Sequence, residues 1–235
     1  MIGKVRYGKS IIQYSIVKSK RRKTSQIIVD RDNVVVRTPK TKSVREIRNL
    51  MEEKAKWIYK KKLELKKVKP SIEKPTFREG SFIPYLGTNY LLRVKTNQKK
   101  NSVSLKSQEL IITTKEKKLK TKTIQELYED WLRKKAEKFL KSRLKHLSTN
   151  QGVKPSKLVI KKLRNRWGSL TKEGILNLNL NLIKAPKEVI DYIIIHELCH
   201  FEIKDHSFRF WNLVRKYQPN YKLHEKWLRI NRHIT

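Results

Sequence analysis

The chain contains a single cysteine, Cys199, among its 235 residues. One cysteine cannot form an intramolecular disulfide, and it cannot supply the several thiolates of a cysteine-rich zinc module. This scarcity is typical of a reducing compartment, so we expect a cytoplasmic protein. Long apolar runs are also missing. Nowhere do about 18 apolar residues follow one another, which argues against a signal peptide and a membrane span.

Acidic residues are few, with 21 Asp and Glu against 58 Lys and Arg and a formal net charge of +37. A field of this sign attracts polyanions, so nucleic acid is a candidate partner. The alternative is that lysine runs such as Lys60–Lys62 only form solvated helix faces. Charge specifies no reaction, and both interpretations stay open at this point.

Hydrophobic residues make up only 37% of the chain, but they recur in periodic patterns that a disordered chain would lack. Patterns typical of short strands occur at 11–17, 25–29 and 34–37. A capping box at Ser43–Glu46 then begins a predicted helix of roughly 20 residues that ends near Pro70. The segment 70–80, with two prolines and a glycine, is typical of a linker.

Further strand patterns fall at 83–86, 90–94, 103–105 and 110–112. With the preceding elements they predict a β-rich N-terminal module with one helix, spanning residues 1–120. The remaining residues, 121–235, form the second predicted domain. The fold class is therefore α+β.

The second domain is predicted to be mainly helical. A capping box at Thr123–Glu126 begins a long helix. Strands follow at 158–163 and 175–182, and in the latter leucine and asparagine alternate, which predicts one buried and one polar face. Three more helical patterns come after them: one from Pro186, one over 208–217 and one over 223–230.

The helix after Pro186 contains His196-Glu197-Leu198-Cys199-His200, an H-E-x-x-H motif. Positions four apart lie on one helix face, so both imidazoles can bind one zinc ion. Glu197, beside the same site, is the candidate general base for a zinc-activated water. The alternative for Glu197 is an ordinary surface glutamate, but the apolar run before the motif indicates a buried helix whose polar groups need partners.

His206 is the candidate third ligand. In a continuous helix it would lie about 9 Å beyond His200 along the axis, so the helix must end first. The polar residues around Lys204, with Asp205 or Ser207 as a cap, favour such a break. Three histidines plus water form a catalytic zinc arrangement, because a structural site closes the fourth position with protein. A surface or capping histidine is the alternative, and Cys199 is interpreted as a small apolar filler.

These residues resemble a known family. The H-E-x-x-H motif, His206-Ser207, Phe210-Trp211 and the upstream Arg166–Ser169 segment are similar, in this order, to the YgjP-like metallopeptidase domain, also called DUF45 or M48-type. The resemblance spans nearly the whole chain. It implies a zincin-like C-terminal domain related to SprT-type proteases, with His196, His200 and His206 as zinc ligands and Glu197 catalytic.

Two residues depart from related patterns. Leu170 stands where the family usually has a small residue. This difference affects the lining of the core and not the metal site. Ile203 stands where metzincins have a glycine, which argues against that class. By analogy with the SprT-like enzymes, the basic surface would suit substrates bound to nucleic acid, an argument from association alone.

Zinc-dependent proteolysis of a protein or peptide is therefore the leading function. A metal-dependent nucleotide phosphohydrolase is one alternative, although no glycine-rich phosphate loop is visible. A non-enzymatic, basic nucleic-acid-binding protein with a vestigial zinc site is the other, and the intact Glu197 weighs against it. His224, Tyr217 and Arg166 are unranked candidates for stabilising an oxyanion.

Overall fold

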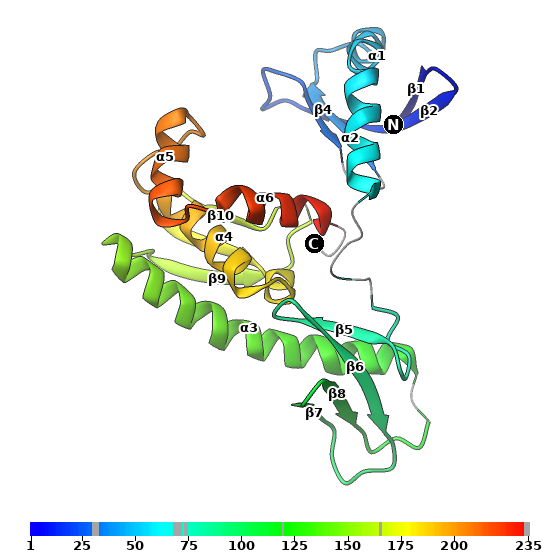
Figure 1. Ribbon diagram of the computed structural model, residues 1–235, viewed down its shortest axis with the longest axis vertical. Helices are drawn as coiled ribbons and strands as arrows, with labels where there is room; N and C mark the ends of the chain where they lie inside the picture. Colours follow the sequence, from blue (N-terminus) through cyan, green and yellow to red (C-terminus); the bar gives the residue numbers. More distant parts are fainter. Residues whose placement is uncertain (30–32, 68–71, 73–74, 119, 165, 233–235) are drawn as a thin grey trace. The chain divides into compact units, whose positions relative to one another are not determined.

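A computed structural model describes residues 1–29, 33–67, 72, 75–118, 120–164 and 166–232 (Figure 1). The chain divides into two compact units, Met1–Pro70 and Ser71–Thr235. Both contain strands and helices, so the fold is mixed α+β, as expected. Positions 70, 71, 73 and 74 of the predicted linker lie outside the described residues.

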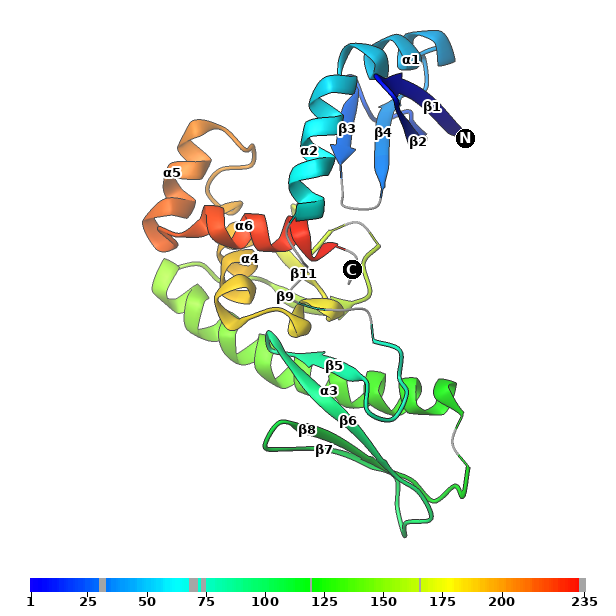
Figure 2. The same ribbon diagram turned by 45° about the vertical axis from the view of Figure 1, so that its right-hand side comes forward.

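The first unit is a four-stranded sheet with two helices on it (Figure 2). The strand order is β1-β2-β4-β3, with β2 parallel to β4 and the other pairs antiparallel. Its elements are β1 (Ile2–Tyr7), β2 (Ser10–Ser19), β3 (Gln26–Val29), β4 (Val34–Pro39), α1 (Val44–Glu53) and α2 (Ala55–Lys67).

The predicted single helix is interrupted. The capping box is confirmed, because the Glu46 amide donates to Ser43 Oγ and the Glu46 carboxylate accepts from the Ser43 amide. The chain turns at Lys54, however, and two helices replace one. The turn lets both helices bury apolar side chains: Ile47 and Met51 from α1, and Ile58 and Leu65 from α2.

The second unit begins with another four-stranded sheet and a long helix. The strand order is β5-β6-β8-β7, with β6 parallel to β8, which repeats the pairing pattern of the first unit although the sequence shows no repeat. The elements are β5 (Phe82–Tyr85), β6 (Thr88–Lys95), β7 (Ser102–Lys106), β8 (Glu109–Thr113) and α3 (Thr121–Gln151). Helix α3 starts two residues before the predicted capping box and has Lys120 at its N-cap.

A three-stranded sheet and three helices complete the unit. They are β9 (Lys157–Lys161), β10 (Gly168–Leu170), β11 (Ile175–Asn179), the 3-10 helix η1 (Leu180–Lys184), α4 (Lys187–Cys199), α5 (Phe208–Tyr217) and α6 (Tyr221–Ile230). In the order β10-β11-β9, β10 is an edge strand. Helix α4 packs against β10, α3, α5 and α6, and both ribbon views show it between α3 and α6 (Figures 1 and 2).

The observed division after Pro70 differs from the predicted boundary near 120. Strands β5–β8 belong to the second unit because their apolar side chains share one core with α3 and α4. The turn between β5 and β6 also bonds to the segment before α4. The Leu86 and Gly87 amides donate to the carbonyls of Ile183 and Lys184, at 2.9 and 3.0 Å. Gly87 has a φ of 80°, and a β-carbon there would lie 2.8 Å from Pro186 Cγ, so glycine permits this close approach.

The leucine–asparagine alternation predicted one polar face, and this prediction is wrong. Strand β11 ends at Asn179, and Asn177 and Asn179 are both buried. Asn179 Nδ2 donates to the carbonyls of Leu163 and Arg166, at 2.7 and 3.0 Å. The buried amide is thus satisfied by backbone groups, and it anchors the loop before β10.

Within the described residues, no helix is long and apolar enough to cross a membrane.

A two-pronged ion pair joins α3 to α4 and generates the first prediction. Arg143 Nε and Nη2 each lie 2.8 Å from an oxygen of Asp191, and both side chains are largely buried. We expect Asp191→Ala to lower the free energy of unfolding by about 1–3 kcal/mol, because it leaves a guanidinium with no partner. The matched control is Glu126→Ala, since Glu126 forms an exposed ion pair on α3 and its loss should change stability by less than about 0.5 kcal/mol. Urea denaturation measures both, and equal effects would contradict the prediction.

Candidate metal centre

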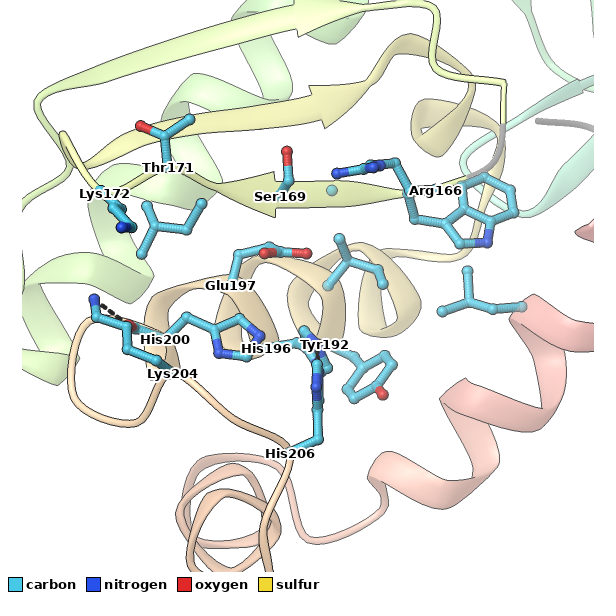
Figure 3. Close-up of a pocket in the computed structure, with 15 residues that line it drawn as sticks. Arg166, Ser169, Thr171, Lys172, Tyr192, His196, Glu197, His200, Lys204 and His206 are labelled. Carbon is cyan, nitrogen blue, oxygen red and sulfur yellow. Dashed lines mark hydrogen bonds between the residues drawn. The ribbon is translucent and has the colours of Figure 1, made fainter. Parts of the chain in front are cut away.

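Helix α4 places His196 and Glu197 in a buried part of the second unit. The apolar residues before them are all buried: Val189, Ile190, Ile193, Ile194 and Ile195. Because residues four apart lie about one turn apart, His196 and His200 project on one side of α4. His200 is the C-cap residue, and the Glu197 side chain points toward β10 (Figure 3).

A turn brings His206 back to α4. The helix ends at Cys199 and α5 begins at Phe208, so the predicted break is confirmed. Ser207 is the N-cap residue of α5, and its amide donates to Asp205 Oδ1 at 3.1 Å. This turn sets His206 Nε2 only 3.1 Å from His196 Nε2.

The three histidines form one cluster. Each offers a ring nitrogen, and these nitrogens all lie within 4.8 Å of one another. Phe210, which is fully buried, packs against all three rings, with centroid distances of 5.0, 4.5 and 4.8 Å to His196, His200 and His206. An apolar ring behind the imidazoles limits their rotation and excludes water from that side.

The orientation of His200 is fixed by the turn that follows it. Its Nδ1 lies 2.9 Å from the Ile203 carbonyl oxygen. Since a carbonyl only accepts, Nδ1 carries the proton and Nε2 keeps its lone pair. Hydrogen bonding of the second ring nitrogen to a carbonyl is common for metal-binding histidines. Ile203, at the position where metzincins have glycine, thus contributes through its backbone.

Burial favours the neutral form of His196 and His206. It lowers the pKa of His196 to about 3, and the neighbouring His206 and His200 add to this effect. Burial also lowers the pKa of His206, with a smaller contribution from His200. Neutral imidazole is the form that binds metal, so His196 and His206 can act as ligands at neutral pH without first losing protons.

Glu197 fills a space that glycine leaves on β10. It is only 7% exposed, and a β-carbon on Gly168 would lie 2.9 Å from both Cγ and Oε1 of Glu197. Burial raises the pKa of Glu197 to about 7, while a hydrogen bond from the Leu170 amide and the charge of Arg166 partly oppose the increase. The carboxylate is therefore held by β10, and its proton affinity suits acid–base chemistry near neutral pH.

The donor set fits a zinc ion. Three imidazoles from α4 and the following turn converge, and zinc with three histidines keeps an open fourth position in catalytic sites. Within the described residues His196 Nδ1 is buried and has no hydrogen-bond partner, so the polar contact of this ring is made at Nε2, which faces His206. Glu197 is not a member of the cluster of ligand atoms, as expected of a base beside a metal.

A pocket of about 490 Å³ opens over the cluster. Its floor is formed by α4, and β10 with its flanking residues Arg166 to Lys172 runs along one wall (Figure 3). Of the three candidates for stabilising an oxyanion, Arg166 lines this pocket, whereas His224 and Tyr217 are not among its lining residues. His224 instead contacts Tyr192, with a centroid distance of 6.0 Å.

Four contributors were not assigned a role from the sequence. Gly168, the Leu170 amide and Asn179 shape the wall beside Glu197, and Phe210 supports the histidines. Gly168 and Phe210 stood in recognised motifs, but no spacing rule relates them to the histidines. Their roles depend on β10 crossing α4 and on α5 folding back, which are contacts between distant segments.

The geometry and the sequence comparison define the same class. The chain matches the family model of the YgjP-like metallopeptidase domain over residues 23–231, which is most of its length. It therefore belongs to the YgjP-like metallopeptidase family and is a zinc metallopeptidase-like hydrolase.

Two solved structures are also similar to the chain. The metallopeptidase zymogen jannalysin of Methanocaldococcus jannaschii is 28% identical, with a TM-score of 0.35, over 41% of this chain and 97% of that one. The zymogen abylysin of Pyrococcus abyssi is 27% identical, with a TM-score of 0.34, over 37% of this chain and 89% of that one. No curated protein matches the sequence.

The converging histidines generate a metal-binding prediction. We expect the wild-type protein to bind about one zinc ion per chain, with the three histidines as its ligands. Mutating a residue that only hydrogen-bonds to a metal ligand weakens metal binding by roughly 10–100-fold. His206→Ala removes a ligand itself, so it should weaken zinc binding by more than this. Chelator competition measures the affinity, and circular dichroism checks the fold.

The matched control is His146→Ala. His146 is an exposed histidine on α3 with a weak 3.4 Å contact to Asn150, and it should be replaceable with no change in zinc affinity. Wild-type affinity in His206→Ala would remove His206 from the ligand set.

Proposed function

We propose that the chain is a zinc peptidase with a zincin-like second unit, in which His196, His200 and His206 hold the metal and Glu197 is the general base. The observation that carries this proposal is the position of the Glu197 carboxylate. It is buried, packs closely against Gly168 of β10 and lines the same pocket as the three histidines. A structural site gains nothing from a carboxylate held in this way.

The protein groups have separate roles in peptide hydrolysis. A zinc ion bound here supplies Lewis-acid chemistry for water and for the scissile carbonyl. Glu197 accepts a proton from the attacking water and returns it to the leaving amine. The Leu170 amide keeps the carboxylate from rotating away, and Gly168 leaves room for it. Arg166 is the candidate for steadying the oxyanion, since it alone of the three candidates lines the pocket.

The other two functions receive less support. A nucleotide phosphohydrolase would need a phosphate cradle, and the sequence has no glycine-rich loop of that kind. A vestigial or structural zinc site would not require the base, and the described residues gather no fourth protein ligand with the three histidines. Peptide-bond cleavage is therefore the reaction that we propose.

Contact with nucleic acid is a separate proposal that rests on the net charge of +37. It would bring the enzyme to proteins that are themselves bound to nucleic acid. Such contact would be independent of Glu197 and would weaken steeply as salt concentration rises, because counterions are released on binding.

Glu197→Gln tests the proposed base. The amide has the same shape but cannot accept the proton, so we expect hydrolysis of an unstructured protein to fall by at least about 100-fold while zinc affinity stays within a few-fold of wild type. Glu202→Gln is the matched control, because Glu202 is exposed on the turn after α4 and does not line the pocket. Zinc-loaded Glu197→Gln with wild-type peptidase activity would refute the proposal. Selective loss of nucleoside triphosphate hydrolysis would favour the phosphohydrolase.

Gly168→Ala tests the positioning of the base. The added methyl would lie 2.9 Å from both Cγ and Oε1 of Glu197, so the carboxylate would have to shift. We expect the free energy of unfolding to fall by about 1–3 kcal/mol, as for other overpacked sites, and kcat to fall about tenfold or more, since general-base catalysis depends on geometry. Zinc affinity should be unchanged. The partner for comparison is Gly152→Ala, where the left-handed φ of 68° predicts strain without any contact at the site. Full activity in Gly168→Ala would show that the close packing has no catalytic role.

A further inference from the structure

The side chains that line the pocket carry an uneven charge. Three of the lining residues are cationic, namely Arg166, Lys172 and Lys204. Among the described lining residues Glu197 is the one carboxylate, and it is buried at the floor. A substrate entering the pocket therefore meets positive charge at the rim, and the proposed reaction leaves this charge unused apart from Arg166.

The positive groups lie at the two ends of the pocket. Arg166 lies at one end of β10, Lys172 and Lys204 lie at the other end, and Glu197 is between them (Figure 3). Lys172 follows Arg166 by six positions, a span of at most about 20 Å in an extended chain. An extended peptide placed along β10, with its cleaved bond near Glu197, would therefore bring residues about three positions away on each side within reach of a cation.

Arg166 and Lys172 are available to a ligand. Both are exposed, and within the described part of the chain neither forms an ion pair, whereas other cations of this unit, such as Arg93, Arg143 and Lys162, are paired with carboxylates. Lys204 is partly engaged, since its ammonium donates to the His200 carbonyl oxygen at 2.6 Å. The backbone of Arg166 is in turn anchored by Asn179 at 3.0 Å, which fixes where its side chain starts.

Building on the proposed peptidase function, we propose that this pocket selects acidic peptides, with carboxylate side chains on both sides of the cleaved bond bound by Arg166 at one end and by Lys172 and Lys204 at the other. Carboxylates form charge-assisted hydrogen bonds with these groups. Basic peptides are disfavoured by like charge, so a protein that is strongly basic throughout is not a good substrate at this site.

The experiment compares peptides of one length and one central sequence that carry glutamate, glutamine or lysine three positions before, after, or on both sides of the cleaved bond. An exposed ionic contact contributes about two- to fivefold, so we expect kcat/KM for the doubly acidic peptide to exceed that of the glutamine peptide by about fivefold or more. The preference should shrink at 0.5 M salt, where screening is stronger.

Variants assign the contacts to the two ends. Lys172→Gln should remove the preference for glutamate on one side only. Arg166 is also the oxyanion candidate and its charge acts on Glu197, so Arg166→Gln is tested by peptide binding in the Glu197→Gln background, where it should remove the preference for glutamate on the other side. Lys157→Gln is the matched control, because Lys157 is an exposed lysine of strand β9 in the same sheet and does not line the pocket. It should retain the full preference on both sides.

Binding to Glu197→Gln separates this inference from the proposed function. Anisotropy with fluorescent peptides should give the same order of affinities even if no peptide is cleaved, because the rim is unchanged in this variant. Equal binding and equal cleavage of acidic, neutral and basic peptides would overturn the inference and leave the peptidase proposal standing. A second outcome would also overturn the inference. If a DNA oligonucleotide competes with all peptides equally, and Lys172→Gln abolishes this competition but leaves peptide binding unchanged, the rim binds polynucleotide.

Discussion

The burial of Glu197 against β10 is the contact on which the geometry of the site depends. A carboxylate in an apolar layer is costly unless donors and nearby charge compensate for lost water. Here the Leu170 amide donates to it, Arg166 contributes positive charge, and Gly168 leaves the space it occupies. The compensation is incomplete, because burial still raises the pKa of Glu197 to about 7. A pKa near neutrality is what the proposed role of Glu197 as a general base requires.

Several distant elements of the second unit serve to hold α4 in this position. Its N-terminal end meets the β5–β6 turn through Gly87 and Pro186. The side of α4 that faces α3 is joined to it by the ion pair between Arg143 and Asp191. Beyond its C-terminal end, Phe210 of α5 supports the rings of all three histidines. The site is thus supported from three sides by segments that lie far apart in the sequence.

The charge of the chain has two distinct consequences. Most of the excess lysine and arginine contributes to a general field that would attract polyanions. The cations around the pocket differ because their positions relative to Glu197 are fixed, at the two ends of β10 (Figure 3). A fixed arrangement can distinguish one peptide from another, whereas the general field cannot.

Much of the fold and site was accessible from the sequence because it depends on local rules. The capping box at Ser43, the helix break before Ser207 and the spacing of His196 and His200 each follow from interactions within a few residues. Errors arose where tertiary contacts override local pattern. The asparagines of β11 appeared solvent-facing but are buried, since Asn179 bonds to a loop 13 and 16 residues earlier. The observed division follows Pro70 and not residue 120, because β5–β8 share a core with α3 and α4.

The sequence by itself determined the family, the mixed α+β class and the chemical inventory of three histidines and a glutamate, because motif spacing on a helix fixes which side chains share a face. Only the tertiary structure decided that His206 Nε2 reaches 3.1 Å from His196 Nε2, that Gly168 accommodates the Glu197 side chain, and that cations lie at both ends of the pocket. These facts depend on how β10 and α5 pack against α4, and such packing is set by the summed burial of many side chains in one core, which no single motif encodes.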